Sequence, residues 1–287
     1  MTTDVTTEPL CRIDNLRIGF AAHDGTVTEA VRGVSLTVNR GERLGVVGES
    51  GSGKSLTGRA LLGLLPDAAQ WSADALCFEG EDLLAMRPKD RRRLCGTKMS
   101  MILQDPKYSL NPVMTVGAQM REAFRLREPK LGARAMREKI VAALDAVHIR
   151  NPAQVADAYP HELSGGMGQR VMIAMMLIPE PDVIIADEPT SALDITVRLQ
   201  VLDVLDELIA KRGIGLIFIS HDLNLVRHFC DRVLVMYAGR VVESCAASDL
   251  ERARHPYTRG LIDTLPRIDR RRERLPQLQR DPAWKGL

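Results

Sequence analysis

Apolar and polar residues alternate along much of this sequence in patterns typical of strands and helices. Over residues 16–38 the alternation is that of two strands, with a hairpin-turn signal at Asp24-Gly25. Buried parallel strands are expected where a short run is almost entirely apolar. Such runs cover 43–47, 99–103, 183–186, 216–220 and 232–236. Helical patterns lie between several of them, for example over 56–65 and 196–211, so we predict an α/β fold with a mostly parallel sheet covered on both faces.

A second pattern interrupts this alternation. From Thr115 to about Ala158 the apolar residues recur at helical spacing and charges are frequent, which predicts a helical insertion over about 105–165. After Gly239 we expect an irregular, basic segment. Its arginines include Arg267, Arg270, Arg271, Arg272 and Arg274. These arginines are interpreted as a solvated tail, with contact to a partner subunit or to acidic lipid as the alternative.

The composition narrows the possible classes of protein. Of the 287 residues, 45% are hydrophobic and 26% are charged, as in soluble globular proteins that bury a full core. The net charge of +2 argues against a nucleic-acid-binding protein, which normally carries a basic excess. No apolar run approaches the roughly 20 residues needed to cross a bilayer, and Met1 to Pro9 lacks the apolar core of a signal peptide. The scattered cysteines suit a reducing cytosol, and the histidines form no cluster that predicts a transition-metal site.

A glycine-rich segment follows the run at 43–47 and precedes a predicted helix. It reads Gly48, Glu49, Ser50, Gly51, Ser52, Gly53, Lys54 and Ser55, which fits the phosphate-loop pattern G-x-x-x-x-G-K-[ST]. Glycines let successive N–H groups face one anion, and the helix N-terminus adds partial positive charge. Lys54 can reach the β- and γ-phosphates, and the Ser55 hydroxyl can bind Mg²⁺. The sequence therefore predicts a nucleotide site.

Two carboxylates follow the apolar run at 183–186. Strand ends in an open α/β sheet are where ligands bind, so Asp187 and Glu188 are expected in the same crevice as the phosphate loop. Asp187 suits the Mg²⁺ shell, directly or through water. Glu188 can act on the water that attacks the γ-phosphate.

A second glycine-rich helix start lies at Leu163 to Arg170. Ser164 is a good N-cap, and Gly165 and Gly166 leave backbone N–H groups open to an anion. One chain already has a complete phosphate cradle at 48–55. The second motif is therefore either a helix cap or a contact with phosphate held by another copy.

Taken together, these motifs resemble those of ATP-binding cassette (ABC) ATPases over residues 16–239. LSGGMGQR at 163–170 is similar to the family signature LSGGQ and departs from it at Met167 and Gly168, where altered local contacts are expected. Residues 48–55 and 183–188 resemble the Walker A and Walker B motifs, and SALD at 191–194 resembles the D-loop. The resemblance implies a P-loop NTPase (RecA-like) core, an N-terminal antiparallel β subdomain and a helical insertion. It places an ATPase domain over 1–250 and a family-specific extension over 251–287.

The resemblance also assigns roles to three further residues. Gln104 is similar to the Q-loop glutamine, which couples Mg²⁺ and the γ-phosphate to motion of the insertion. His221 is similar to the switch histidine. Phe20 matches the aromatic position that stacks on adenine, with a plain core or edge-strand aromatic as the alternative.

Two segments resemble a narrower group within that family. Residues 104–120 and 255–267 are similar to subunits that drive oligopeptide, dipeptide and nickel importers. Many of these have a cysteine-containing tail for an iron–sulfur cluster, but no cysteine follows Cys245, so that cofactor is not expected. The resemblance implies a peripheral ATPase on the cytoplasmic face of the cell membrane, using ATP and Mg²⁺.

Its expected partners are integral membrane permease subunits, a second ABC ATPase subunit (identical or a paralogue) and, indirectly, an external solute-binding protein. Peptides are the expected cargo and nickel or a nickel chelate is the alternative. Two other classes stay open: a soluble ABC ATPase of DNA repair or translation, and a P-loop kinase or non-hydrolytic nucleotide module. Co-purification with integral membrane proteins would separate the transporter from both.

Overall fold

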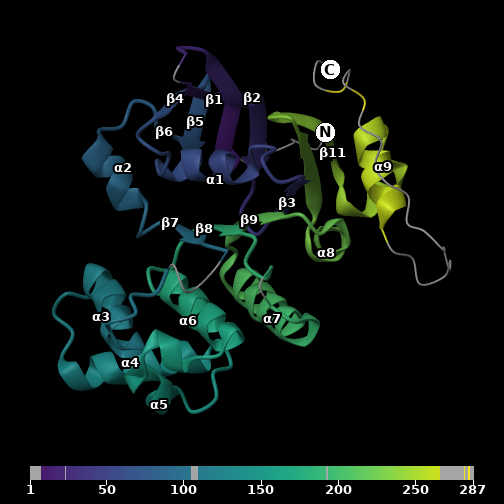
Figure 1. Ribbon diagram of the computed structural model, residues 1–287. Coiled ribbons are helices and arrows are strands. Elements are labelled where there is room, and N and C mark those ends of the chain that lie inside the picture. Colours follow the sequence, from purple (N-terminus) through teal and green to yellow (C-terminus); the bar gives the residue numbers. More distant parts are fainter. Residues whose placement is uncertain are drawn as a thin grey trace, which may run out of the picture. The chain divides into compact units, whose positions relative to one another are not determined.

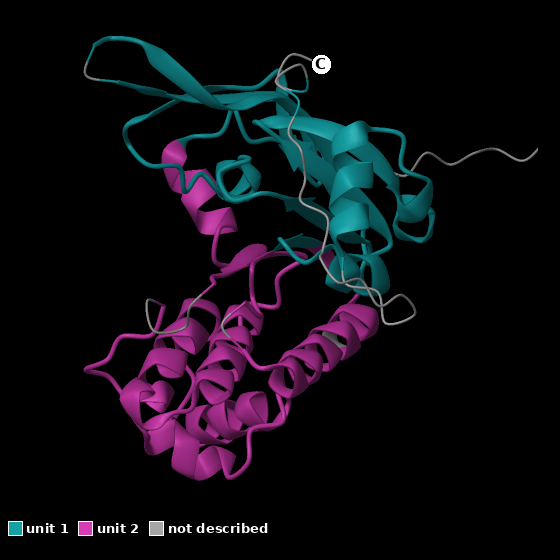
Figure 2. Ribbon diagram, turned by 45° about the vertical axis from the view of Figure 1, so that its right-hand side comes forward, with its two compact units in different colours: residues 1–87, 217–287 teal, residues 88–216 magenta. Residues whose placement is uncertain are grey.

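The computed structural model describes residues 8–22, 24–104, 109–191, 193–265, 281 and 284, without the side chain of Leu208. The arginine-rich segment from Arg267 to Arg274 and Ala192 of the D-loop motif lie outside the described residues. The chain forms two compact units, coloured separately in Figure 2. The first combines Met1–Arg87 with Ile217–Leu287, and the second is Pro88–Leu216. Strand β9 (Gly215–Ser220) carries the chain from the second unit back into the first.

An antiparallel sheet opens the first unit (Figure 1). Its strands are β1 (Cys11–Ala21), β2 (Val27–Val38), β4 (Ala69–Ser72), β5 (Ala75–Phe78) and β6 (Glu81–Asp82). They follow the order β2-β1-β5-β6, and β4 also pairs with β1. Gly25 has a φ of 81° in the turn between β1 and β2, which confirms the hairpin expected at Asp24-Gly25. The expected N-terminal antiparallel subdomain is therefore present.

The first unit also contains strands of the predicted, mostly parallel sheet, in the order β11-β10-β3-β9. Strand β3 (Arg43–Gly48) runs parallel to β10 (Arg232–Tyr237), and β11 (Arg240–Ala246) runs antiparallel to β10. All residues of β3 after Arg43 are buried, which explains why a short apolar run identified it. The remaining elements of this unit are α1 (Lys54–Leu62), α8 (Leu223–Phe229), the 3₁₀ helix Ala247–Arg252 and α9 (Pro256–Thr264). Helix α1 contacts β1, β2 and β3, so it joins both sheets.

The expectation of irregular structure after Gly239 is wrong. The chain turns back through Ala238 and Gly239, whose φ angles of 47° and 82° are those of a type I′ hairpin turn. It then pairs β11 with β10 and forms α9. Most side chains of β11 are half-buried and do not alternate, so pairing with β10, and not a local apolar pattern, holds this strand in place.

The second unit is mainly helical around two parallel strands, β7 (Met99–Ile102) and β8 (Val183–Asp187). Its helices are α2 (Pro88–Leu94), α3 (Val116–Arg127), α4 (Ala133–Asp145), α5 (Pro152–Asp157), the 3₁₀ helix Pro160–Glu162, α6 (Gly165–Leu177) and α7 (Ile195–Arg212). Helices α3, α4 and α5 contact one another, which confirms the helical insertion. Thr115, Ser164 and Asp194 cap α3, α6 and α7 through their side-chain oxygens. Among the described residues, no helix is both long enough and apolar enough to span a membrane.

All five cysteines are free thiols. Burial raises the pKa of the Cys11 thiol from 9.0 to about 12, and burial also raises the pKa of Cys230. Nucleophilic attack needs the thiolate. These two cysteines are therefore apolar core residues and not reactive groups.

Candidate nucleotide-binding site

The phosphate-loop segment joins the end of β3 to the start of α1 in the first unit. Gly48 has a φ of 154°, and a Cβ there would lie 2.1 Å from the carbonyl oxygen of Met236 on β10. Gly53 has a φ of 98°, and a Cβ there would lie 2.8 Å from the carbonyl oxygen of Ala30 on β2. Both positions exclude a side chain because two strands approach the loop closely. The glycine spacing found in the sequence thus has a steric cause in this fold.

Lys54 closes the loop from inside. Its side chain is buried, and its Nζ donates hydrogen bonds to the carbonyl oxygens of Gly48 and Glu49, both at 2.8 Å. Ser52 is buried, and its hydroxyl has no hydrogen-bond partner among the described residues. Ser50 and Gly51 are exposed at the tip, and Ser55 is half-buried in the first turn of α1. A curled backbone, a helix N-terminus and one ammonium group make this loop suitable for an anion.

Two further predicted residues lie in the same unit. Phe20 is half-buried on β1, where it is opposite Thr28 of β2 and Ala69 of β4. His221 is exposed and directly follows β9. The next residue, Asp222, caps α8 by accepting a hydrogen bond from the Leu225 N–H at 3.1 Å. His221 is therefore held between a strand end and a capped helix.

The second unit brings together two predicted residues from neighbouring parallel strands. Gln104 lies just beyond β7, and its Nε2 donates to Oε2 of Glu188 at 3.2 Å, just beyond β8. Asp187, the last residue of β8, is buried. Glu188 has a φ of 48°, in the left-handed region that costs a residue with a side chain about 1–3 kcal/mol. The N–H and hydroxyl of Ser191 both donate to the Glu188 carbonyl and hold this bend.

The glycine-rich start of α6 is capped in the way that its sequence indicates. The Ser164 hydroxyl accepts a hydrogen bond from the Met167 N–H at 3.3 Å. A Cβ on Gly166 would lie 2.4 Å from Cγ1 of Val197 on α7, whereas a Cβ on Gly165 would meet no atom within 4 Å. Gly166 therefore permits close packing of two helices, and the exposed Gly165 leaves the backbone of the helix start open. Ser164 caps the helix while the start of α6 stays exposed, so a helix cap and a contact with phosphate can occur together.

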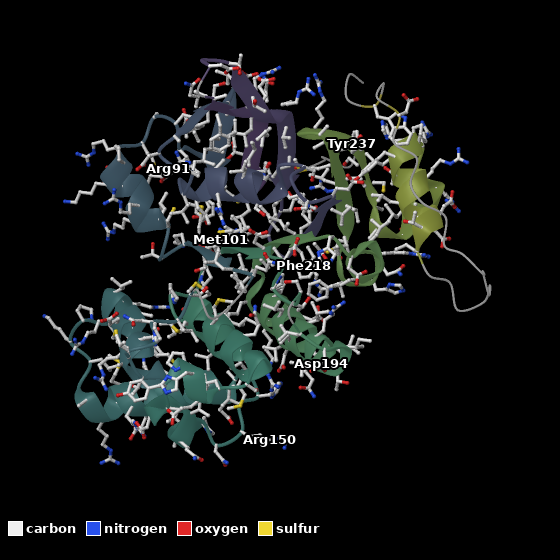
Figure 3. All side chains as sticks on the ribbon, viewed as in Figure 1. Arg91, Met101, Arg150, Asp194, Phe218 and Tyr237 are labelled. Carbon is white, nitrogen blue, oxygen red and sulfur yellow. The ribbon has the colours of Figure 1, made fainter. Side chains whose placement is uncertain are left out.

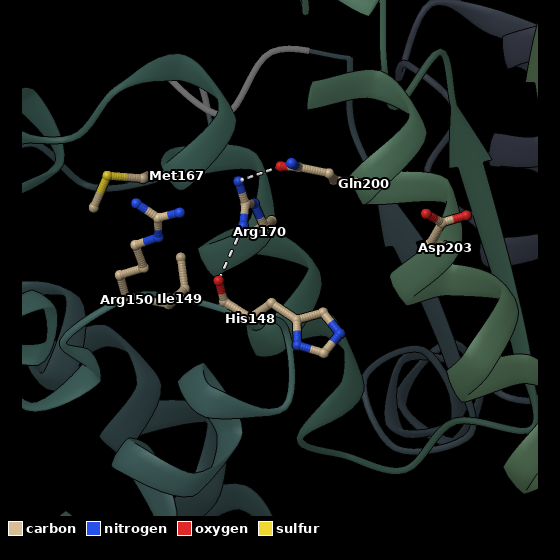
Figure 4. Close-up of a pocket in the computed structure, with 7 residues that line it drawn as sticks. All are labelled: His148, Ile149, Arg150, Met167, Arg170, Gln200 and Asp203. Atoms are coloured by element: carbon tan, nitrogen blue, oxygen red, sulfur yellow. Dashed lines mark hydrogen bonds between the residues drawn. The ribbon is translucent and has the colours of Figure 1, made fainter. Parts of the chain in front are cut away.

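A cavity of about 600 Å³ lies beside α6 (Figure 4). It is lined by His148, Ile149, Arg150, Met167, Arg170, Gln200 and Asp203. Arg170 donates to the carbonyl oxygen of His148 at 3.0 Å and to Oε1 of Gln200 at 3.1 Å, so it links α6 to α7 and to the turn after α4. Met167, the departure from the common signature, contributes to the wall of this cavity.

Comparison with known proteins decides the family. The family model described as ABC transporter matches residues 31–191. The chain belongs to the ABC transporter family. It is 44% identical to the dipeptide transport ATP-binding protein DppD of Bacillus subtilis (strain 168), over 91% of this chain and 78% of that protein. It is 46% identical to the oligopeptide transport ATP-binding protein OppD of Mycobacterium tuberculosis (strain ATCC 25618 / H37Rv), and there it covers 91% of this chain but only 42% of the relative.

Solved structures agree with this family at the level of the fold. The dimeric structure of MJ0796, a bacterial ABC transporter cassette, is 22% identical with a TM-score of 0.74, covering 83% of this chain and 98% of that one. The predicted resemblance, the P-loop NTPase fold and the ATPase class are thereby confirmed.

One residue of this ABC ATPase contacts the phosphate loop although no sequence pattern predicts the contact. The Tyr257 hydroxyl on α9 accepts a hydrogen bond from the backbone N–H of Glu49 at 3.2 Å. Tyr257 lies in the segment 255–267, which resembles peptide and nickel importers. Nothing in that segment connects it to residues so far away in the chain. The contact forms only when α9 packs within the folded first unit.

Proposed function

We propose that this chain is the ATP-hydrolysing subunit of an importer for dipeptides and oligopeptides. The phosphate loop carries the proposal: two of its glycines are sterically required, and Lys54 is enclosed at the start of α1. The proposed cargo is that of the relatives, which are named as dipeptide and oligopeptide transport proteins.

In the first unit, the proposed roles follow from the donors present. The loop N–H groups and Lys54 bind the β- and γ-phosphates, for which Lys54 must turn away from the carbonyls of Gly48 and Glu49. Ser55 offers a hydroxyl oxygen to Mg²⁺, a cation that prefers oxygen ligands. Phe20 stacks on adenine, and His221 contacts the γ-phosphate.

In the second unit, Asp187 and Gln104 supply the remaining oxygen ligands proposed for Mg²⁺. The buried carboxylate of Asp187, at the end of β8, offers oxygen ligands of the kind that Mg²⁺ prefers. Glu188 is the general base that takes a proton from the attacking water. The hydrogen bond from Gln104 orients the Glu188 carboxylate for that role.

The proposed assembly contains two cassettes, identical or paralogous. Ser164, Gly165 and Gly166 of one cassette contact the γ-phosphate held by the phosphate loop of the other. The chain binds integral membrane permease subunits at the cytoplasmic face of the cell membrane, and an external solute-binding protein delivers the cargo. Nucleic acid is not among the proposed partners.

Growth on peptides tests the proposal. Cells lacking the protein should fail to grow when a dipeptide or oligopeptide supplies a required amino acid, and they should grow normally on the free amino acid. The wild-type gene should restore growth, whereas Glu188→Gln should not. Normal peptide uptake combined with loss of nickel-dependent urease or hydrogenase activity would replace peptides with nickel as the cargo.

A further inference from the structure

Helix α9 places a tyrosine against the phosphate loop. Tyr257 is the second residue of α9 and is 0% exposed. Its hydroxyl oxygen accepts the hydrogen bond from the Glu49 N–H at 3.2 Å. Both residues belong to the first unit, so this contact lies within one compact body.

The Glu49 residue is held on both of its backbone polar groups. Tyr257 accepts from its N–H, and Lys54 Nζ donates to its carbonyl oxygen at 2.8 Å. If Lys54 binds phosphate as proposed above, the carbonyl oxygens of Gly48 and Glu49 lose this donor when nucleotide arrives. The Glu49 N–H already donates to Tyr257, so the proposed phosphate contacts are made by Lys54 and by the other N–H groups of the loop, and the hydrogen bond to Tyr257 can remain.

The position of the phenol is itself fixed. The Tyr257 ring lies 4.4 Å from the ring of Tyr237 on β10, the strand that also approaches Gly48; Tyr237 is labelled in Figure 3. The Tyr257 N–H donates to Nδ1 of His255 at 3.2 Å, and the Glu243 carboxylate of β11 accepts from the His255 N–H at 2.8 Å. A side chain held in this way loses little further conformational entropy when it supports the loop.

We propose that Tyr257 is a positioning residue for ATP: its hydroxyl fixes the Glu49 peptide and keeps the phosphate loop in its anion-binding shape when Lys54 turns from the loop carbonyls to the phosphates. This inference rests on the proposed nucleotide site. It gives the segment 255–267 a function inside the ATPase, in addition to its value as a mark of a transporter group. The energetic basis is preorganisation, because a loop that is already shaped loses less entropy on binding.

The substitution Tyr257→Phe tests the role, because it keeps the ring and removes the hydroxyl that accepts from the Glu49 N–H. We expect the Kd of the full chain for ATP, measured by calorimetry with Mg²⁺ present, to rise about threefold to tenfold, as for the loss of one buried hydrogen bond. In the assembled transporter, the KM for ATP should rise by the same factor while kcat changes less than twofold. A purely structural role would lower the melting temperature and leave both Kd and KM unchanged, and that result would overturn the proposal.

Thr258→Val is the matched control. Thr258 is the next residue of α9, is equally buried, and its hydroxyl has no partner among the described residues. Valine keeps its shape, so ATP affinity should stay at the wild-type value. An equal loss of affinity in Thr258→Val would show that any change in this helix disturbs the loop, and the specific role of the Tyr257 hydroxyl would be rejected.

A measurement on the wild-type protein covers the case in which Tyr257→Phe does not fold. Without nucleotide, the Glu49 amide should exchange its proton with deuterium more slowly than the exposed Gly51 amide, and it should stay protected when ATP is bound. Equal exchange of the two amides without nucleotide, or loss of Glu49 protection with ATP, would reject the proposal. The variant Lys54→Ala distinguishes failure of the proposed nucleotide site from failure of the positioning role of Tyr257. If Lys54→Ala binds ATP as tightly as wild type, the nucleotide site itself is wrong; if it loses binding while Tyr257→Phe keeps full affinity, only the positioning role fails.

Discussion

Glu188 combines a strained backbone with a specific side-chain contact. Its positive φ turns the chain sharply after β8, and the hydrogen bond from Gln104 fixes its carboxylate. Strained residues with a side chain persist where the surrounding structure enforces them, and they cluster at active sites. This geometry supports Glu188, rather than the adjacent Asp187, as the base.

Glu188→Gln should still bind ATP, because the amide keeps the size of the side chain and the phosphate loop is untouched. Its ATP turnover in the assembled transporter should fall by about 10²–10⁴-fold, the usual contribution of a general base. Steady-state phosphate release measures the loss. Glu180→Gln is the control: Glu180 also has a positive φ and lies in the second unit, but it pairs with Arg127. It should keep full turnover, and a loss of less than about tenfold in Glu188→Gln would assign the base to another group.

The two glycines at the start of α6 have different neighbours, so substitutions there distinguish helix packing from ligand binding. Gly166→Ala would force a Cβ against Val197, so we expect the free energy of unfolding to fall by about 1–3 kcal/mol, as in other overpacked contacts. Gly165→Ala meets no atom and should keep or slightly raise the melting temperature, because alanine favours a helix over glycine. Thermal unfolding of the two variants measures the difference.

ATP turnover of the same variants tests whether the start of α6 also contacts phosphate. If Gly165 contacts phosphate of a second cassette, Gly165→Ala should lower ATP turnover although its stability is unchanged. Wild-type turnover in Gly165→Ala would limit this motif to a helix cap.

Strands that the sequence predicted are stabilised differently from strands that it did not predict. Strand β3 and the run that became β8 are buried along almost their whole length, so a continuous apolar pattern revealed them. Strand β4 has one half-buried and three exposed residues, and β11 is mostly half-buried; both depend on pairing with β1 and β10. The phosphate loop carries its geometry in its own glycines, whereas the contact of Tyr257 with Glu49 depends on tertiary folding. The phosphate loop could therefore be predicted from its local sequence, whereas the contact between Tyr257 and Glu49 could not.

For the whole molecule, the decisive prediction concerns assembly. With its proper partner cassette present, Glu188→Gln should dimerise when ATP is added, because ATP is bound and hardly hydrolysed. Adding Ser164→Arg to both cassettes should prevent this by placing a bulky side chain at the proposed contact with the γ-phosphate. Light scattering measures the change in mass. Gln70→Arg, at an exposed position on β4, is the control and should dimerise normally. Dimerisation of the Ser164→Arg protein would contradict the composite site.

The parallel pairing of β3 with β10 has a consequence for how the protein is made. Gly48 lies opposite Met236, so the strand that encloses the phosphate loop leaves the ribosome only after the whole second unit has been synthesised. Nascent chains that end within the second unit contain the complete loop sequence but lack this neighbour. We therefore expect them to bind no ATP, and the nucleotide can act as a folding ligand only late in translation.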